Sequence, residues 1–322
     1  MRYDRLEPLE LSTKEIKNST VTVVGAGATG SRMLEQLVRI GADIRIIDRD
    51  LLEEENLATS ALYTEEQVKE RLPKAVAAKE RLEDINSDTK IKSKVADLNS
   101  QTVDSLLSLS DIILDGTDNM ETRFLVNEWC VKNSVPWVHV SAIRSSGEVM
   151  PIVPDRTSCF NCVFEGVKGS SLETCETAGI SPAAASVAAS VGVRKALEVL
   201  EGSVEGKLTR FDLEKGDFQE LVTGRESCNV CKGEEFPYLE GDEGTTAIAV
   251  CGEDKYQVNP GSEIDLEGTA DKLEESGTVT LNSYLLRFDG DEKFTLFQDG
   301  RMIVEAESRE GARSVYSRFI GN

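Results

Sequence analysis

The sequence predicts an α/β protein built on a mixed, mostly parallel sheet with a zinc clamp, followed by a small α+β domain. Three observations predict this class. Short apolar runs alternate with helical stretches over the first half of the chain, and a glycine-rich turn, Gly25–Gly30, follows the first run. Two Cys-x-x-Cys pairs, Cys159 with Cys162 and Cys228 with Cys231, lie in the second half.

The first half of the chain alternates predicted strands and helices after a charged N-terminal arm. The predicted strands are Thr20–Val24, Ile44–Asp48, Ile91–Ala96, Ile112–Asp115 and Trp137–Ser141. The predicted helices are Ser31–Ile40, Lys74–Asn86 and Thr122–Asn133. Strands that alternate with helices form βαβ units, so the sheet should be mostly parallel.

The second half predicts further strands and then a second domain. The elements before the domain boundary are strands at Glu148–Val153, Lys207–Leu213 and Asp217–Val222, and a helix from Pro182 to Leu200. The acidic, glycine-rich stretch Glu234–Gly244 predicts a solvated linker. We therefore expect a first domain at residues 1–240 and a small α+β domain at residues 241–322. The small domain should hold two helices and the strands Ala247–Val250, Ser283–Phe288, Phe294–Phe297 and Met302–Ala306.

Composition and charge exclude several function classes. The formal net charge of -22 over 322 residues argues against a nucleic-acid partner, because phosphate binding needs clustered Lys and Arg. The longest uncharged stretch, Ala178–Val193, is too short and too small-sided to span a membrane. Seven cysteines and a charged start, Met1–Glu7, predict a protein of the reducing cytoplasm.

The two cysteine pairs predict a structural Zn²⁺ site. Each pair can direct two thiolates at one tetrahedral ion, and four thiolates leave no open position for catalysis. The interval between the pairs is long, so the metal would clamp distant segments of one large domain. Two reduced, buried pairs are the plainer alternative, and disulfides are a third. Cys175 lies alone between the pairs.

The glycine-rich turn predicts a nucleotide site. It lies between a predicted strand and a predicted helix, where glycines permit a close approach and the helix N-terminus offers free N–H groups to phosphate. Asp48 ends the next strand and could accept hydrogen bonds from ribose hydroxyls. An NAD(P) oxidoreductase is the default interpretation. The single histidine, His139, lies on an apolar strand and is expected in the core, which argues against a proton relay.

A second group of polar residues predicts a triphosphate ligand. Asp115–Asn119 closes a strand at the carboxyl edge of the sheet, where open α/β folds bind ligands. A carboxylate there, such as Asp118, could hold Mg²⁺ over a triphosphate, although a plain exposed turn is the alternative. Lys74, at the start of a helix, could neutralise phosphate charge or could be an ordinary surface lysine.

Taken together, these pieces resemble the MoeB/ThiF/HesA superfamily of ubiquitin-activating-type enzymes. The resemblance covers roughly residues 1–235, and its pieces follow the family order: Arg2–Arg5, the glycine turn, Asp48–Asp50, Asn56–Leu57, Pro73–Lys74, Asp118–Asn119, the first cysteine pair, Cys175 and the second pair. It implies a Rossmann-like sheet, normally in a homodimer. It also implies that Mg-ATP is used to adenylate the C-terminal glycine of a small ubiquitin-like protein ending in Gly-Gly. That partner would be a MoaD/ThiS-type sulfur carrier or a protein modifier, and pyrophosphate would be released.

The resemblance implies a role for each matching residue. The ATP-binding positions would be Gly25, Gly27, Ala28, Gly30, Asp48, Asp50, Asn56, Lys74, Asp118 and Asn119. Among these, Asp118 would position Mg²⁺ and Lys74 would offset charge on the phosphates. Arg5 would enter the site of the partner subunit. Cys175 matches a mobile-loop cysteine that takes the carrier covalently, although Glu173 and Glu176 beside it should weaken it as a nucleophile.

The match breaks after Leu57. The family reads Asn-Leu-x-Arg-Gln, with the Arg on the triphosphate, whereas this chain has Thr59 and Ser60 at the last two positions. An inserted arginine can be worth on the order of 10³–10⁵ in phosphoryl-transfer rate. Arg71 or Arg49 could supply the charge instead, and we expect Arg71 to matter far more. The alternative is a weak or inactive member that acts as an ATP- and carrier-binding adaptor.

Overall fold

The computed structural model describes residues 2–6, 13–166, 178–224, 227–241, 247–249, 255–258, 263–274 and 276–320. The chain divides into two compact units, Met1–Asp242 and Glu243–Asn322. Among the described residues, no helix is long and apolar enough to cross a membrane.

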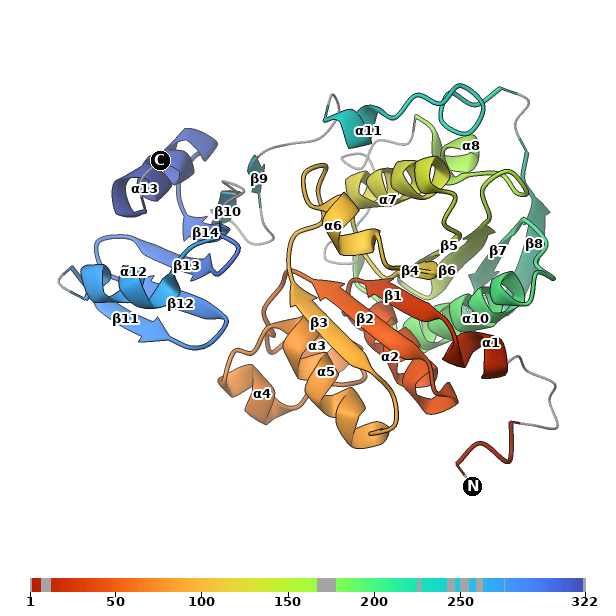
Figure 1. The fold of residues 1–322 in the computed structure, drawn as a ribbon, viewed down its shortest axis with the longest axis horizontal. Coiled ribbons are helices and arrows are strands. Elements are labelled where there is room, and N and C mark those ends of the chain that lie inside the picture. The colour runs from red at the N-terminus through yellow and green to blue at the C-terminus, as the bar shows by residue number, and fades with distance from the viewer. Residues whose placement is uncertain are drawn as a thin grey trace. The chain divides into compact units, whose positions relative to one another are not determined.

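The first unit is built on an eight-stranded sheet (Figure 1). Five strands run parallel in the order β3 (Ile91–Val95), β2 (Asp43–Asp48), β1 (Thr20–Val24), β4 (Ile112–Asp115) and β5 (Trp137–Ile143). The sheet continues antiparallel through β6 (Ser146–Ile152), β7 (Lys207–Asp212) and β8 (Asp217–Val222). The predicted mixed, mostly parallel sheet is confirmed.

Helices cover both faces of this sheet (Figure 1). One face packs against α1 (Thr13–Lys17), α2 (Ala28–Ile40), α5 (Lys74–Ile85) and α10 (Pro182–Leu200). The other packs against α6 (Val103–Leu107), α7 (Met120–Asn133) and α8 (Phe160–Phe164). Successive strand residues alternate between the two cores, so Val23 belongs to the first and Val24 to the second. Both faces are apolar, which explains the continuous apolar runs in the sequence.

The strand order reverses at β1, which lies between β2 and β4. The loops that follow β1 and β4 therefore diverge to opposite faces and leave a crevice at their carboxyl ends. The first loop passes very close to the second. Gly25 has φ +86°, and a Cβ there would lie 2.7 Å from the Gly116 carbonyl oxygen. A Cβ at Gly30 would lie 1.9 Å from the Gly25 oxygen, so neither position has room for a side chain.

The expected linker at Glu234–Gly244 is wrong over its first half. Helix α11 (Pro237–Glu240) lies there and packs on α7. The Tyr238 and Phe124 rings stack with centroids 5.1 Å apart, and the Leu239 amide donates to Glu128 Oε2 at 2.9 Å. The acidic composition of this stretch concealed the aromatic residues that dock it.

The second unit is a small α+β domain. Its six-stranded antiparallel sheet has the order β11 (Thr278–Leu281), β12 (Leu285–Asp289), β13 (Lys293–Phe297), β14 (Met302–Glu305), β10 (Lys255–Val258) and β9 (Ala247–Ala249). Helices α12 (Leu266–Leu273) and α13 (Arg309–Phe319) share one apolar core with this sheet. The sequence did not predict β10 or β11. In β11, Thr278, Thr280 and Leu281 are all exposed. The strand therefore lacks the alternation of buried and exposed side chains that is typical of a half-buried strand.

Candidate active site

A pocket opens at the carboxyl ends of β1, β2 and β4. Its walls come from the glycine turn, the residues after β2, the start of α5, the residues after β4 and the return segment before α10. The lining residues are Val24, Gly25, Gly27–Thr29, Ile47–Asp50, Lys74, Ala96–Leu98, Gly116–Asn119, Thr122, Arg123, Ser141, Ala142 and Ile180. The crevice expected at the strand-order reversal is therefore where most of the predicted nucleotide-site residues gather.

Asp48 ties the glycine turn to the end of β2. Its Oδ2 accepts a hydrogen bond from the Ala26 amide at 2.6 Å, and its Oδ1 accepts one from the Asp50 amide at 2.7 Å. Burial, followed by the negative charge of Asp50, raises the pKa of Asp48. The Tyr63 hydroxyl donates to the Ala26 carbonyl from the other side. Asp48 therefore shapes the turn as well as lining the pocket.

Lys74 is fixed at the start of α5 by Asp50. Its amide donates to the Asp50 carbonyl at 2.8 Å, and its Nζ lies 3.1 Å from Asp50 Oδ2. Burial would lower the pKa of Lys74, but the charges of Asp50, Asp48 and Asp118 together raise it above its ordinary value. The raised pKa favours the charged form of Lys74, which is a mostly buried residue of the pocket wall and not a solvated surface residue.

A buried ionic network supports the turn after β4. Asp115 Oδ2 lies 3.1 Å from both Arg123 Nε and His139 Nδ1, and its Oδ1 accepts from the Thr117 amide and hydroxyl at 2.9 and 2.6 Å. Arg123 also donates to the Thr117 carbonyl. Burial alone would raise the pKa of Asp115, but Arg123, His139 and Thr117 hold it below its ordinary value. His139 is buried, as expected, and burial lowers its pKa.

This network presents Asp118 to the pocket. Asp118 is exposed, and among the described residues its carboxylate makes no hydrogen bond or ion pair. The next residue, Asn119, caps helix α7, because its Oδ1 accepts from the Glu121 amide at 2.8 Å. The turn is therefore rigid on both sides of a carboxylate that remains available to a ligand.

The two arginines expected to replace the family arginine lie in different places. Arg49 lines the pocket, and its guanidinium pairs with Asp97 at 2.9 Å and with Asp50 at 3.7 Å. Arg71 is exposed and is not among the lining residues. The expectation that Arg71 matters more than Arg49 therefore has no support in this geometry.

Three predicted residues are not among those that line the pocket: Gly30, Asn56 and Arg5. Asn56 begins α3 (Asn56–Thr59), and its Oδ1 accepts from the Glu53 amide at 3.0 Å. Arg5 is exposed, and the nearby Tyr3 bonds to Asn86 at the far end of α5. Cys175 lies outside the described residues. The roles of Asn56, Arg5 and Cys175 stay predictions.

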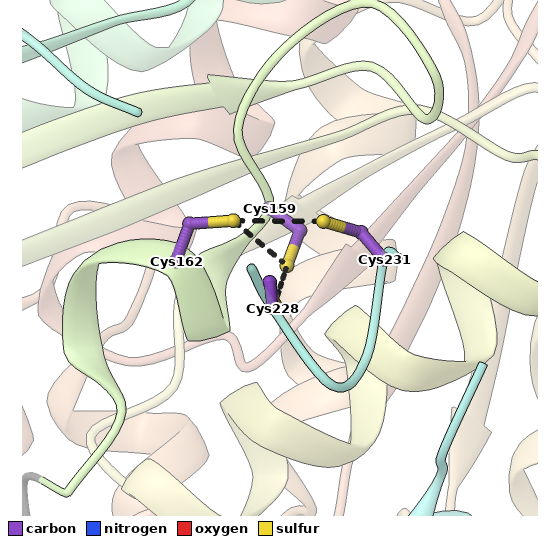
Figure 2. Close-up of side chains that lie close together, drawn as sticks. All are labelled: Cys159, Cys162, Cys228 and Cys231. Atoms are coloured by element: carbon purple, nitrogen blue, oxygen red, sulfur yellow. Dashed lines mark hydrogen bonds between the residues drawn. The ribbon is translucent and has the colours of Figure 1, made fainter. Parts of the chain in front are cut away.

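The four cysteines of the two pairs meet at one point (Figure 2). Their sulfur atoms all lie within 4.8 Å of one another, and the separations of Cys159 from Cys162 and Cys228 are both 3.7 Å. Cys162 and Cys231 are 3.5 Å apart. A tetrahedral ion with bonds of about 2.3 Å to sulfur requires sulfur–sulfur distances of about 3.8 Å. The cluster therefore fits Zn²⁺, and the thiols are free, not joined as disulfides.

Helix α7 supports this cluster through Asn127, a residue that the sequence did not single out. Its Oδ1 accepts from the Phe160 amide and its Nδ2 donates to Asn161 Oδ1, both at 2.9 Å. Asn127 is fully buried. Its polar side chain inside a predicted helix was the one available signal, and it did not reveal the partner. Tyr63 was also missed, since it lies in a segment without periodicity.

The first unit is therefore an α/β fold with a charged pocket at the strand-order reversal and a four-cysteine cluster whose geometry is compatible with a metal ion. A profile of the ThiF family matches residues 6–232. The chain belongs to the ThiF family.

Named relatives agree with this assignment. The chain is 36% identical to a sulfur carrier protein ThiS adenylyltransferase of Bacillus subtilis, over 99% of both chains. It is 30% identical to a sulfur carrier protein adenylyltransferase of Thermus thermophilus, over 69% of this chain and 85% of that one. These similarities identify the chain as an adenylyltransferase. The interpretation as an NAD(P) oxidoreductase is therefore wrong.

Solved structures show the same fold. E. coli MccB with ATP superposes with a TM-score of 0.61 at 21% identity, covering 72% of this chain and 74% of that chain. E. coli MccB with AMPCPP and MccA gives a TM-score of 0.63 at 22% identity.

Proposed function

We infer that this chain adenylates the C-terminal glycine of a small ubiquitin-like carrier that ends in Gly-Gly, with ATP as co-substrate. The observation that carries this proposal is the 36% identity to a ThiS adenylyltransferase across 99% of both chains. The pocket supports it, because its residues suit an adenine nucleotide with a charged phosphate tail.

Adenylation requires the pocket to align the two substrates and to neutralise charge on the phosphates. A carboxylate oxygen of the carrier attacks the α-phosphorus of ATP, the bond from that phosphorus to the bridging oxygen of the β-phosphate breaks, and pyrophosphate leaves. The products are an acyl adenylate and pyrophosphate, so no oxidant or further reactant is required. Catalysis depends on in-line alignment and on neutralising the charge that develops on the leaving group.

The glycine turn and Lys74 serve the phosphates. The first turn of α2 presents backbone N–H groups, and its dipole favours negative charge. Lys74 is held in the pocket with its charge intact, and so can stabilise the leaving pyrophosphate. Asp48 has both oxygens engaged with backbone amides, but each oxygen has a second lone pair for a ribose hydroxyl.

The residues fit Mg²⁺ as a cofactor. Asp118 is an exposed carboxylate in the pocket wall, and carboxylate oxygen is the ligand that Mg²⁺ prefers. Asp118 would hold the ion, which when bound neutralises charge between the phosphates. Zn²⁺ would occupy the four-cysteine cluster in a purely structural role, because four thiolates close its coordination.

Two further parts of the proposal concern a homodimer and a covalent step. Arg5 is exposed and is not among the residues that line its own pocket, which suits a residue that reaches a partner subunit. Cys175 would take the carrier after adenylation, when its thiolate attacks the carbonyl carbon and AMP leaves. A Cys175→Ala variant should keep adenylation and lose any covalent adduct.

ATP–pyrophosphate exchange tests the proposal. The purified chain is mixed with each small host protein that ends in Gly-Gly, labelled pyrophosphate and ATP. We expect label to enter ATP with one carrier and not with the same carrier lacking its terminal glycine. Measurable ATP binding without exchange for any carrier would refute the proposal and favour the adaptor alternative.

A further inference from the structure

The nucleotide pocket contains more negative than positive charge. Its lining carboxylates are Asp48, Asp50, Asp97 and Asp118, and its lining cations are Arg49, Lys74 and Arg123. Each of these cations already lies between 2.9 and 3.1 Å from a carboxylate. A triphosphate adds several negative charges, so the pocket needs a further cation besides Mg²⁺.

Arg32 lies directly behind the glycine turn. It is on the second turn of α2, and its Nη1 donates to the carbonyl of Ala28 at 2.9 Å and to the carbonyl of Thr59. Its Nε donates to Ser186 Oγ at 2.8 Å. Ala28 lines the pocket, so the guanidinium lies against the back of the pocket wall.

Among the residues that the structure describes, the charge of Arg32 has no anionic partner. All three acceptors are neutral oxygens, and none of the ion pairs among the described residues includes Arg32. Burial lowers the pKa of Arg32 against the weaker opposing effect of Glu35, which itself pairs with Arg39 at 2.8 Å. A half-buried guanidinium with neutral partners is stabilised when an anion binds beside it.

The position of Arg32 coincides with the place where the chain departs from its family. Thr59, whose carbonyl Arg32 holds, is the residue at the family's arginine position. Among the described residues, none accepts a hydrogen bond from Arg32 Nη2. That nitrogen remains available to a ligand.

We propose that Arg32 is a catalytic residue that contacts the terminal phosphates of ATP, in place of the arginine that position 59 lacks. This rests on the proposed function, because it assumes that the nucleotide in the pocket is ATP. The guanidinium reaches the phosphates from α2, across Ala28, whereas the family arginine would reach them from α3.

A purely structural role is the rival explanation. Arg32 also joins three segments, since its partners Ala28, Thr59 and Ser186 lie on α2, α3 and α10. A brace of this kind would support every nucleotide equally. A phosphate ligand would distinguish ATP from AMP, because AMP lacks the two terminal phosphates.

The test is equilibrium binding of ATP and of AMP to the full chain at one Mg²⁺ concentration, by calorimetry. Arg32→Ala removes the side chain, and Arg32→Gln keeps donors for the carbonyls but removes the charge. Arg39→Ala is the matched control, because Arg39 lies on the same helix with an exposed ion pair. Loss of a charge-assisted contact should weaken ATP binding about tenfold to hundredfold in both Arg32 variants. AMP binding should not change.

A rescue variant completes the design. Arg32→Gln combined with Thr59→Arg should restore ATP binding, because it returns the charge to the family position. Equal loss of ATP and AMP binding, or unchanged ATP binding in Arg32→Gln, would overturn the proposal. Binding needs neither carrier nor turnover, so this result is independent of whether carrier-dependent exchange succeeds.

Discussion

The pocket and the cysteine cluster lie in the same unit but are built in opposite ways. The pocket is lined by charged groups from several loops, and Asp118, the metal ligand that we propose, is exposed. The cluster is closed, with Cys159 and Cys228 only 1% and 3% exposed and packed in an apolar core. A site that exchanges ligands must stay open to solvent. A site that keeps one ion is more stable when solvent is excluded from it.

Helix α7 is the support that both sites share. Arg123 holds the turn that carries Asp118, Asn127 holds the first cysteine pair, and Glu128 holds α11. All three side chains are buried polar groups within one turn and a half of helix. Because the partners of these side chains differ, a substitution on α7 should weaken one of the two sites and leave the other unchanged.

Removing one cysteine should have the largest effect. Cys228→Ser leaves three thiols, so the chain should lose its zinc and a stabilisation on the order of several kcal/mol. Metal content by mass spectrometry and thermal unfolding measure both. Cys130→Ala is the matched control, because Cys130 is buried outside the cluster and its loss should leave zinc in place. A Cys228→Ser protein with full zinc content would contradict the structural-metal account.

Asp118→Asn should strongly reduce catalysis and spare the fold. Loss of the charged ligand should cut ATP–pyrophosphate exchange by about 10²–10³, comparable with removing one preorganised electrostatic contact. The melting temperature should not move, since Asp118 is exposed. Glu121→Gln serves as the control, because it removes the charge of an exposed carboxylate in the first turn of α7 that does not line the pocket. If both variants exchange at the same rate, Asp118 has no part in the reaction.

Asn127→Ala should weaken the cluster and not the pocket. It leaves the buried Phe160 amide without its acceptor, at a cost of about 1–3 kcal/mol. Zinc should then be lost faster to a chelator, while ATP affinity stays at the wild-type value. Unchanged zinc release would show that α7 does not stabilise the first cysteine pair.

His139→Gln should produce the smallest effect, and a pH-dependent one. Burial lowers the pKa of His139 below its ordinary value of 6.5, so the unfolded chain binds more protons just below that pH. The stability of the wild type should therefore fall as the pH drops below 6.5, with a slope of at most about 1.4 kcal/mol per pH unit. Denaturant unfolding between about pH 5 and 7 should show a flatter slope in the variant. Equal slopes would mean that His139 does not titrate in this range.

The sequence predicted much of the first unit because periodicity and local motifs decide it. The runs at Thr20–Val24 and Ile112–Asp115 are buried strands, as expected, and the glycine turn joins β1 to α2. The meeting of the two cysteine pairs could be predicted because the ligand spacing of each pair is typical of one Zn²⁺ site. These features need no knowledge of distant contacts.

The sequence could not reveal contacts between residues far apart in the chain. The Asp115 network depends on Arg123 and His139, and neither spacing nor composition predicts their meeting. In the sequence, Arg32 looks like an ordinary residue on the surface of a helix. Only the fold shows that it contacts Thr59. Arg49 and Arg71 are near Thr59 in the sequence, whereas Arg32 is far from it in the sequence and contacts it in the fold.

The most direct measurement of the central claim follows one oxygen atom. The carrier is prepared with its C-terminal carboxylate labelled with the heavy isotope of oxygen and is incubated with the enzyme, ATP, Mg²⁺ and a thiol acceptor. If a carboxylate oxygen attacks the α-phosphorus, one labelled oxygen leaves with AMP after acyl transfer, and mass spectrometry of AMP should detect it. Unlabelled AMP, or no AMP at all, would contradict the assignment of this pocket to carrier adenylation.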